Sequence, residues 1–457
     1  MKFSPKLTLP ATLLLCAGGA FAADAEPNIA AHQAQIDQIV KEISPQRIEG
    51  YVRKLVGFGT RHTMSDTVSD TRGIGAARRW IKSELERCGA AAGGRLQVGY
   101  DSHVHPVTPR LSHPTEIVNV VATLPGGQAE SVDRMYVVSG HYDSRVTDVM
   151  NATSDAPGAN DDASGTAAVM EMACVMARHK FDATLVFMTV AAEEQGLFGA
   201  EHFAEQAKQK NWNIAGMLNN DIIGSSHADD GHVDNTQVRL FAEGVPAVKE
   251  MSDANRALVA TGGENDSITR QLARHIKETG ERYVDKFAVN VIYRRDRYLR
   301  GGDHSPFLDR GYAAVRFTEP NEDFNHQHQD LREEGGKKIG DLPEYDDFNY
   351  IAQVARVNAA SLASLALAPA APQLVKVRTA KLDNNTDLTW QANKEPDLAG
   401  YRIVWRDTTA AQWQGSIFVG NTTQYTVKRS KDNFLFGVQA VDKDGNVSVA
   451  TYPLPQR

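Results

Sequence analysis

The sequence predicts an α/β fold with a mostly parallel central sheet flanked by helices, followed by a smaller all-β sandwich. Three observations support this prediction. Short apolar runs alternate with helical periodicity over residues 44–367. A segment rich in alanine and proline, 368–372, interrupts the pattern, and short alternating stretches follow it at roughly ten-residue spacing. The early runs are nearly continuously apolar, which is typical of parallel strands that are buried on both faces.

The composition is that of a large globular protein. The chain has 457 residues, of which 42% are hydrophobic and 23% charged, and both fractions are close to the average for soluble proteins. This length is enough for two or three domains of about 100–200 residues each. The net charge of −8 argues against a broad basic face, so no nucleic-acid partner is predicted.

Residues 1–22 have the pattern of an export signal. Lys2 and Lys6 precede an apolar stretch that is too short to anchor the chain across a membrane. Ala20-Phe21-Ala22 matches a cleavage site, so we predict export to the periplasm or the exterior without a membrane anchor. A lipid anchor on Cys16 is the alternative, and the bulky Leu15 before it argues against that anchor.

Cleavage of this signal would leave two cysteines, Cys88 and Cys174. Export permits a disulfide between them, but Cys174 falls in an apolar helical pattern that equally suits a buried free thiol. Both states therefore stay open. Neither cysteine has the paired spacing of a zinc–thiolate site, so any metal must be held by nitrogen and oxygen ligands.

A polar leader is expected over 23–43, and the larger domain over 44–367. Within that domain, residues 268–300 are expected to form loops that shape a pocket. Short valine-rich runs predict strands, and apolar residues at three- and four-residue steps predict helices. The expected strands are Ile117–Leu124, Met135–Ser139, Thr184–Val190, Met217–Ile223 and Ala313–Thr318, and the expected helices include Ala163–Arg178, Ala200–Gln209 and Phe348–Leu365.

Residues 373–457 are expected to form the sandwich, because alternating stretches are separated there by turn residues. This segment also resembles a fibronectin type III domain through Leu388-Thr-Trp390, Leu398-Ala-Gly-Tyr401, and Phe436–Asp442 with Gly445-Asn446. The sequence shows no chemistry in this part of the chain. We expect this part of the chain either to contact a surface or polymer or to be removed by processing.

Five motifs carry acids and histidines, and four of them follow predicted strands. Ligands of open α/β sheets bind beyond the carboxyl ends of the strands, so these side chains are expected to meet at one edge. Each motif alone has a simpler explanation, such as helix capping, but their joint occurrence favours a metal site. The motifs are Ser139–Ser144, Pro157–Gly165, Ala191–Leu197, Asn219–Gly224 and Asn325–Asp330.

This series resembles the co-catalytic di-zinc exopeptidases, a family that includes bacterial leucyl aminopeptidases and plasma-type glutamate carboxypeptidases. The resemblance covers about residues 44–367. It implies two zinc ions, of which one is bound by His141 and Asp221 and the other by Glu194 and His326. Asp161 would bridge both ions, since one carboxylate with two oxygens can offset the repulsion between two cations.

The resemblance further implies that Glu193 is the general base and that Asp143 orients His141. A general base must lie next to the zinc ligand Glu194 without binding metal itself. Adjacent residues at the end of a strand allow this, because their side chains point apart. A carboxylate beside a ligating histidine fixes its ring and raises its basicity.

The choice of the last ligand follows the family pattern His-x-x-x-Asp, which selects His326 with Asp330. His328 is the alternative, because in an extended chain it would lie on the same side as His326. The motif Gly302–Phe307 also matches the family. Its Asp303 and His304 are expected to build the pocket and not to bind metal.

These inferences predict an exported zinc aminopeptidase that acts on peptide or protein substrates. Three alternatives stay open. A glutaminyl-cyclase-like enzyme with one zinc, or a metallocarboxypeptidase, would use the same fold. A binding or adhesion protein would keep the metal site as a structural element and act through its sandwich.

Overall fold

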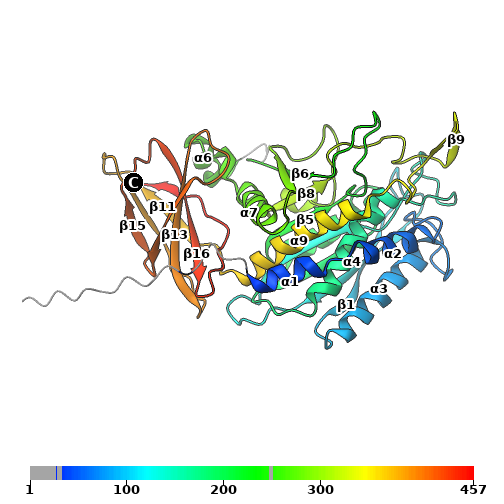
Figure 1. Ribbon diagram of the computed structural model, residues 1–457, viewed down its shortest axis with the longest axis horizontal. Coiled ribbons are helices and arrows are strands. Elements are labelled where there is room, and N and C mark those ends of the chain that lie inside the picture. Colours follow the sequence, from blue (N-terminus) through cyan, green and yellow to red (C-terminus); the bar gives the residue numbers. More distant parts are fainter. Residues whose placement is uncertain (1–26, 28–32, 246–250) are drawn as a thin grey trace, which may run out of the picture.

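The computed structural model describes residues 27, 33–245 and 251–457 (Figure 1). The predicted export signal, residues 1–22, lies outside the described residues. Within the described ranges, no helix has both the length and the apolar character needed to span a bilayer. A large α/β domain is followed by a smaller strand-rich domain, which lies at one end of the molecule (Figure 1).

An eight-stranded sheet forms the centre of the larger domain, in the order β1-β2-β4-β3-β5-β8-β6-β7. The pairs β3–β4, β3–β5, β5–β8 and β6–β7 are parallel. The pairs β1–β2, β2–β4 and β6–β8 are antiparallel. The strands are β1 (Gln97–His105), β2 (Thr115–Leu124), β3 (Arg134–His141), β4 (Thr184–Val190), β5 (Asn213–Asn220), β6 (Gln237–Ala242), β7 (Ala288–Ile292) and β8 (Ala314–Thr318).

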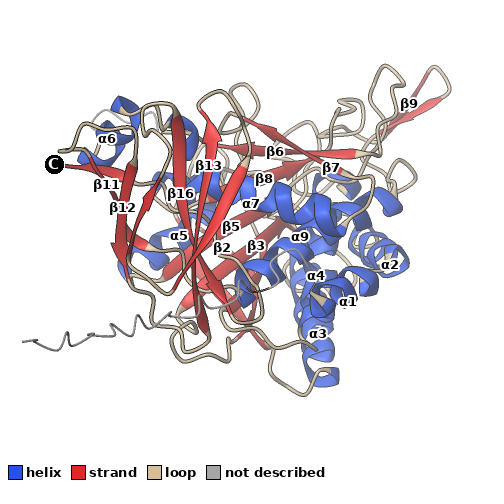
Figure 2. Ribbon diagram, turned by 60° about the vertical axis from the view of Figure 1, so that its left-hand side comes forward, coloured by secondary structure: helices blue, strands red, loops and turns tan. Residues whose placement is uncertain are grey.

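Helices cover both faces of this sheet (Figure 2). Adjacent residues of β3 show the division, because Val138 packs with one set of helices and Val137 with the other. The first face carries α1 (Ala34–Glu42), α2 (Pro45–Val56), α3 (Gly73–Ala91), α4 (Ser164–Met176), α7 (Ile268–Tyr283) and α9 (Phe348–Leu367), and the second carries α5 (Phe198–Gln209) and α8 (Ser305–Asp309). The predicted α/β class is confirmed.

Two expectations about this domain are wrong. The polar leader expected through residue 43 contains α1, whose Ile36, Ile39 and Val40 are buried in the core. Residues 268–300, expected as loops, contain α7 and β7. The sequence conceals both features because α1 is short and because the buried face of α7 includes polar residues such as Thr269 and Gln271.

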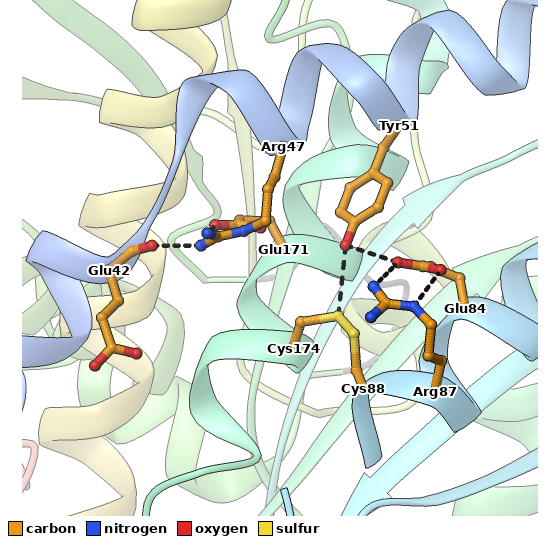
Figure 3. Close-up of a disulfide and its surroundings, with 8 residues drawn as sticks. All are labelled: Glu42, Arg47, Tyr51, Glu84, Arg87, Cys88, Glu171 and Cys174. Carbon is orange, nitrogen blue, oxygen red and sulfur yellow. Dashed lines mark hydrogen bonds and ion pairs between the residues drawn. A yellow bond between two sulfur atoms is a disulfide. The ribbon is translucent and has the colours of Figure 1, made fainter. Parts of the chain in front are cut away.

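A disulfide between Cys88 and Cys174 joins α3 to α4 (Figure 3). The alternative of two free thiols is therefore wrong. The hydroxyl of Tyr51, from α2, lies 3.7 Å from the Cys174 Sγ and donates a hydrogen bond of 3.2 Å to Glu84 (Figure 3). Three helices on one face of the sheet are thus fastened together at this point.

The C-terminal domain consists of a four-stranded sheet, β15-β12-β11-β17, and a three-stranded sheet, β14-β13-β16. Side chains from both sheets, including Leu388, Trp390, Tyr401 and Val438, share one core, so the predicted sandwich is confirmed. The fibronectin resemblance stays a prediction. The strands are β11 (Gln373–Arg378), β12 (Thr386–Gln391), β13 (Leu398–Asp407), β14 (Gly415–Gly420), β15 (Gln424–Val427), β16 (Phe434–Asp442) and β17 (Leu454–Gln456).

Buried ion pairs hold the two domains together. Arg406 of the sandwich donates to Asp266 of the larger domain at 2.6 Å, and Arg274 lies 3.3 Å from the same carboxylate. A second pair joins Arg134 to Glu395 at 3.5 Å. Removing one partner of such a pair while the interface stays closed would leave an uncompensated buried charge, so these pairs favour one arrangement of the two domains.

The remaining elements lie on the side of the sheet where the predicted motifs gather or beside the sandwich. Helix α6 (Asp253–Ala260) contacts β17, and a small hairpin, β9 (Arg332–Glu334) with β10 (Lys337–Ile339), follows the loop after β8. That loop carries both candidate histidines, His326 and His328. Its path therefore decides which of them reaches the acidic motifs.

Candidate metal centre

Three strand ends, one turn and one loop bring the predicted motifs together. His141 is the last residue of β3, Glu193 and Glu194 follow β4, and Asp221 follows β5. Asp161 lies in the turn that leads into α4 and is joined to Asp162 by a cis peptide bond. The first three strands are neighbours in the sheet, so their carboxyl ends open on one edge, as the sequence predicts.

Two groups of side chains at this edge could each hold a metal ion. His141, Glu193 and Asp221 form the first group, and Asp161, Glu194 and His328 form the second, with potential ligand atoms within 4.8 Å of one another in each. Asp161 also reaches the first group. Its Oδ1 lies 3.0 Å from the His141 Nε2 and its Oδ2 lies 2.8 Å from the His328 Nε2.

The structure does not bring His326 to this edge, so the prediction that it completes the group is wrong. The His326 ring stacks on Tyr345 with the ring centres 3.7 Å apart, and its Nδ1 lies 3.4 Å from the Asp323 carboxylate. The alternative residue, His328, takes its place. The sequence reasoning assumed an extended chain, but His328 has a φ of 51°, which turns the backbone and separates the two side chains.

Asp143, which was predicted to orient His141, also contacts the residues that follow β4. Its Oδ1 lies 3.5 Å from the His141 Nδ1, and its two oxygens accept the backbone N–H groups of Glu193 and Glu194 at 3.3 and 3.2 Å. The same ring nitrogen lies 3.2 Å from the Asp143 carbonyl oxygen. One buried carboxylate therefore contacts two motifs at once, and its role in orienting His141 stays a prediction.

Two further acids hold the turn that carries Asp161, and the sequence analysis missed both roles. Asp162 accepts hydrogen bonds from the backbone N–H groups of His141 and Ile222 at 3.0 and 3.3 Å, so it joins three motifs. Asp341 accepts from the N–H of Asp161 at 2.8 Å. Of these two neighbouring acids, Asp161 is therefore a candidate metal ligand, and Asp162 holds the backbone of the other motifs in position.

Comparison with known proteins identifies the family. Residues 119–335 match the model of peptidase family M28. A probable zinc metalloprotease of Leptosphaeria maculans is 49% identical over 425 residues, which cover 93% of this chain and 98% of the relative. The chain belongs to peptidase family M28. A probable zinc metalloprotease of Pyricularia oryzae is also 49% identical, over 92% of this M28 chain and 85% of its own length.

Solved structures agree on the fold of the M28 domain. The Legionella pneumophila LapA aminopeptidase has a TM-score of 0.51 at 18% identity, covering 75% of this chain and 77% of its own. A Macrostomum lignano glutaminyl cyclase also has a TM-score of 0.51, at 15% identity, covering 75% and 94%. At such identities the likeness shows the fold alone. The predicted exopeptidase resemblance is thus confirmed at the level of family and fold.

The carboxylates of this M28 site raise the pKa values of its two histidines, His141 and His328. Burial opposes protonation of His328, but the carboxylates of Glu194 and Asp161 raise its pKa to about 10. Burial likewise opposes protonation of His141, whose pKa is nonetheless raised well above its usual value by Glu193 and other neighbouring acids. The site is therefore short of positive charge, and a bound cation would supply it in exchange for protons.

The available ligand atoms fit zinc. The His141 Nε2 and the Glu194 Oε1 are buried, and neither has a hydrogen-bond partner among the described residues. A buried polar atom without a partner is costly unless something else binds it. Imidazole nitrogen and carboxylate oxygen are ligands that zinc accepts, although cobalt and manganese accept them too.

A buried arginine supports the first group, and the sequence analysis overlooked it. Arg316, on β8, is fully buried and donates to the Asp221 Oδ1 at 2.8 Å and to Asp296 at 3.2 Å. Gly302 packs against the same pair, since a Cβ there would lie 2.8 Å from Arg316 and 3.0 Å from Asp221. An arginine inside the otherwise apolar run Ala314–Thr318 was the available sequence signal.

The neighbouring Asp303 is fully buried, and neither of its carboxylate oxygens has a hydrogen-bond partner among the described residues. Burial is the main cause that raises its pKa to about 8, and the acids Asp221 and Asp143 add to the effect. His304 is instead occupied, because its Nε2 contacts the Arg295 carbonyl oxygen at 2.9 Å. The predicted pocket role of these two residues stays a prediction.

Proposed function

We propose that this M28 protein is an exported aminopeptidase that binds two zinc ions and hydrolyses the first peptide bond of its substrates. The position of Asp161 supports the proposal most directly, because its two oxygens face histidines from two distant segments. The zinc named for the fungal relatives supports the choice of metal. The proposed ligands are His141 and Asp221 for one ion, Glu194 and His328 for the other, and Asp161 for both.

Zinc in such a site polarises a carbonyl group and makes a water molecule acidic near neutral pH. Glu193 is the proposed general base. Burial raises the pKa of its carboxyl well above the usual range, and the neighbouring acids Asp221 and Glu194 add to this. A base with a raised pKa can accept a proton from water and later deliver it to the departing amine. Asp143 holds the Glu193 backbone in place for this transfer.

The amino end of a peptide is favoured by the local charge. A substrate ammonium group is a cation and would be stabilised near carboxylates. Asp303 supplies two oxygens that accept no hydrogen bond from the described residues, and it interacts electrostatically with Glu193. We therefore propose Asp303 as part of the pocket for the free amine.

Export is supported by the disulfide. Cys88 and Cys174 are bonded to each other, and such bonds persist mainly in oxidising compartments. This agrees with the export signal proposed for residues 1–22. Cell fractionation of the full chain, with N-terminal sequencing of the mature protein, tests both points. A mature protein that retains Met1 in the cytoplasm would contradict them.

The proposed activity is tested with aminoacyl arylamides and short peptides, before and after a chelator. Purified protein should contain about two zinc ions per chain, lose activity on chelation, and regain it with added zinc. Peptides with a blocked amino end should resist cleavage. Efficient release of the last residue from such blocked peptides would instead establish a carboxypeptidase.

A second candidate function is that of a glutaminyl-cyclase-like enzyme, which the shared fold with the Macrostomum lignano protein keeps open. Such an enzyme with one zinc would cyclise an amino-terminal glutamine without cleaving a peptide bond. A zinc content near one, together with cyclisation of Gln-arylamide and no peptide hydrolysis, would favour it. The presence of two candidate metal groups supports the peptidase.

A further inference from the structure

Arg145 is an arginine at the candidate metal centre whose guanidinium group has no hydrogen-bond partner among the described residues. Its side chain is only 16% exposed, and its Nε is buried. The nearest acid is Glu194, whose Oε2 lies 3.6 Å from that Nε, which is too far for a good hydrogen bond. The other oxygen of Glu194 faces His328 at 3.0 Å, inside the second metal group.

Two other buried arginines of this domain, Arg61 and Arg316, have close protein partners for their terminal guanidinium nitrogens. Arg61 donates to the carbonyl oxygens of Tyr142, Pro157 and Gly158, and Arg316 pairs with two acids. Leaving guanidinium N–H groups unpaired costs free energy. Arg145, by contrast, has only the 3.6 Å ion pair with Glu194 and makes no hydrogen bond with the described residues, so its guanidinium N–H groups are available to a ligand.

The surroundings of Arg145 indicate what that would be. Arg110 donates from its Nη1 to the Glu194 carbonyl oxygen at 2.9 Å, so two guanidinium groups flank one residue of the metal group. Thr147 accepts a hydrogen bond from the backbone N–H of Asp330, which ties the Arg145 loop to the loop of His328. The positive charge therefore lies at the border of the second metal group, where it favours an anion.

We propose that Arg145, assisted by Arg110, binds a carboxylate of the residue that follows the scissile bond. Guanidinium groups bind carboxylates through two parallel hydrogen bonds. One residue spans about 3.3–3.6 Å, so a carbonyl held at the metal group would leave the next residue's carboxylate within reach of Arg145. Resting on the aminopeptidase proposal, this inference assigns short peptides, above all dipeptides with a free carboxyl end, as preferred substrates.

Substrate pairs that differ only in the terminal carboxylate test this inference. The wild-type enzyme should have a kcat/KM for Leu-Leu about 10–100 times that for Leu-Leu amide, as expected for a charged hydrogen bond. Arg145→Met should bring this ratio close to one, and Arg145→Lys should restore part of it. The matched control is Arg53→Met, on the exposed surface of α2, which should leave the ratio unchanged.

A second pair distinguishes a terminal carboxylate from a side-chain carboxylate. Leu-Glu amide and Leu-Gln amide both lack the terminal charge, so a preference for the former that disappears in Arg145→Met would assign the subsite to an acidic side chain. Loss of the preference only in the Leu-Leu pair would assign it to the peptide end. If Arg145→Met lowered kcat/KM equally for the charged and the neutral peptide of each pair, the inference would be overturned. An unchanged ratio of kcat/KM in both pairs would overturn it too.

Direct binding separates this inference from the proposed activity. Calorimetry on the zinc-loaded Glu193→Gln protein should show Leu-Leu binding about 10–100 times more tightly than Leu-Leu amide, and adding Arg145→Met should remove the difference. If the wild type cleaves none of these peptides while the difference persists, the aminopeptidase proposal fails and the carboxylate subsite stands. Equal affinity of Glu193→Gln for both peptides would refute the subsite whatever the activity.

Discussion

The two halves of the candidate metal centre are built in different ways. His141 ends one strand, and Glu193 and Asp221 follow its two neighbours. The Asp221 N–H donates to the Phe317 carbonyl oxygen of β8 at 3.2 Å, and Arg316 lies against the Asp221 carboxylate. Asp161, Glu194 and His328 combine a turn, a strand end and a long loop. His141 is 1% exposed in its side chain, whereas His328 is 26% exposed.

This difference shows where precision in such a site comes from. Strand ends place side chains with the accuracy of the sheet hydrogen bonds, so a site built on strands is more precise than one built on loops. A ligand on a loop depends on the local path of the backbone, which a single positive φ can redirect. We therefore expect the first half to be rigid before metal binds and the second half to be completed by the metal.

The largest effect is expected from Glu193→Gln. This change keeps the shape of the side chain but removes its ability to accept a proton, so kcat should fall by about 10²–10⁴-fold. Zinc content should stay near two per chain if Glu193 is a base and not a ligand. Metal analysis and arylamide kinetics measure both quantities. Glu201→Gln, on the exposed surface of α5, is the control, and wild-type turnover by Glu193→Gln would refute the base assignment.

The next largest effect should separate the two histidines of the loop. His328→Ala removes a proposed ligand of the second half, so zinc content should fall from about two to about one and activity by about 10²-fold or more. His326→Ala is the matched control, because its ring lies against Tyr345 and beside Asp323, outside both candidate metal groups. If His326→Ala lost zinc and His328→Ala did not, the assignment of the second half would be reversed.

The same contrast explains how much could be predicted from the sequence. His141, Glu194 and Asp221 could be placed because each follows an apolar run, and parallel strands share one carboxyl edge. The strand order could not be derived from these runs, nor could β6 and β7, which are short and close the sheet beyond β8. The fold class and most candidate ligands could therefore be predicted from the sequence, whereas the geometry of the loops could not.

The missed residues share a physical reason. Arg316 and Asp341 act through contacts with residues far away in the chain, and no periodicity marks such contacts. Arg145 comes directly after the motif Ser139–Ser144, but its significance depends on its making no hydrogen bond with the described residues. The sequence lists side chains in order, whereas the value of a buried charge depends on what surrounds it.

A smaller effect, on stability, should reveal the rigidity of the first half. Arg316→Met leaves Asp221 and Asp296 without their shared cation, so the free energy of unfolding of the metal-free protein should fall by about 3–5 kcal/mol. Arg310→Met removes ion pairs to Glu201 and Glu205, whose side chains are largely exposed, and should cost only about 0–1 kcal/mol. Denaturant unfolding with chelator present measures both. Equal losses would show that Arg316 does not hold the first half together.

The smallest effect expected on the site itself comes from the disulfide. Cys88 and Cys174 are 86 residues apart in the chain, and opening a loop of this length should lower the free energy of unfolding by about 2–4 kcal/mol. The bond joins α3 to α4, and none of the proposed metal ligands belongs to either helix. Its removal should therefore leave both halves of the metal centre with all their ligands. The double variant Cys88→Ser, Cys174→Ser should therefore unfold at lower denaturant yet bind about two zinc ions, and reductant should reproduce its behaviour in the wild type. If the variant lost zinc from the second half alone, the position of Asp161 would depend on α4, the helix that follows it. The second half would then be built on a helix as well as on a loop.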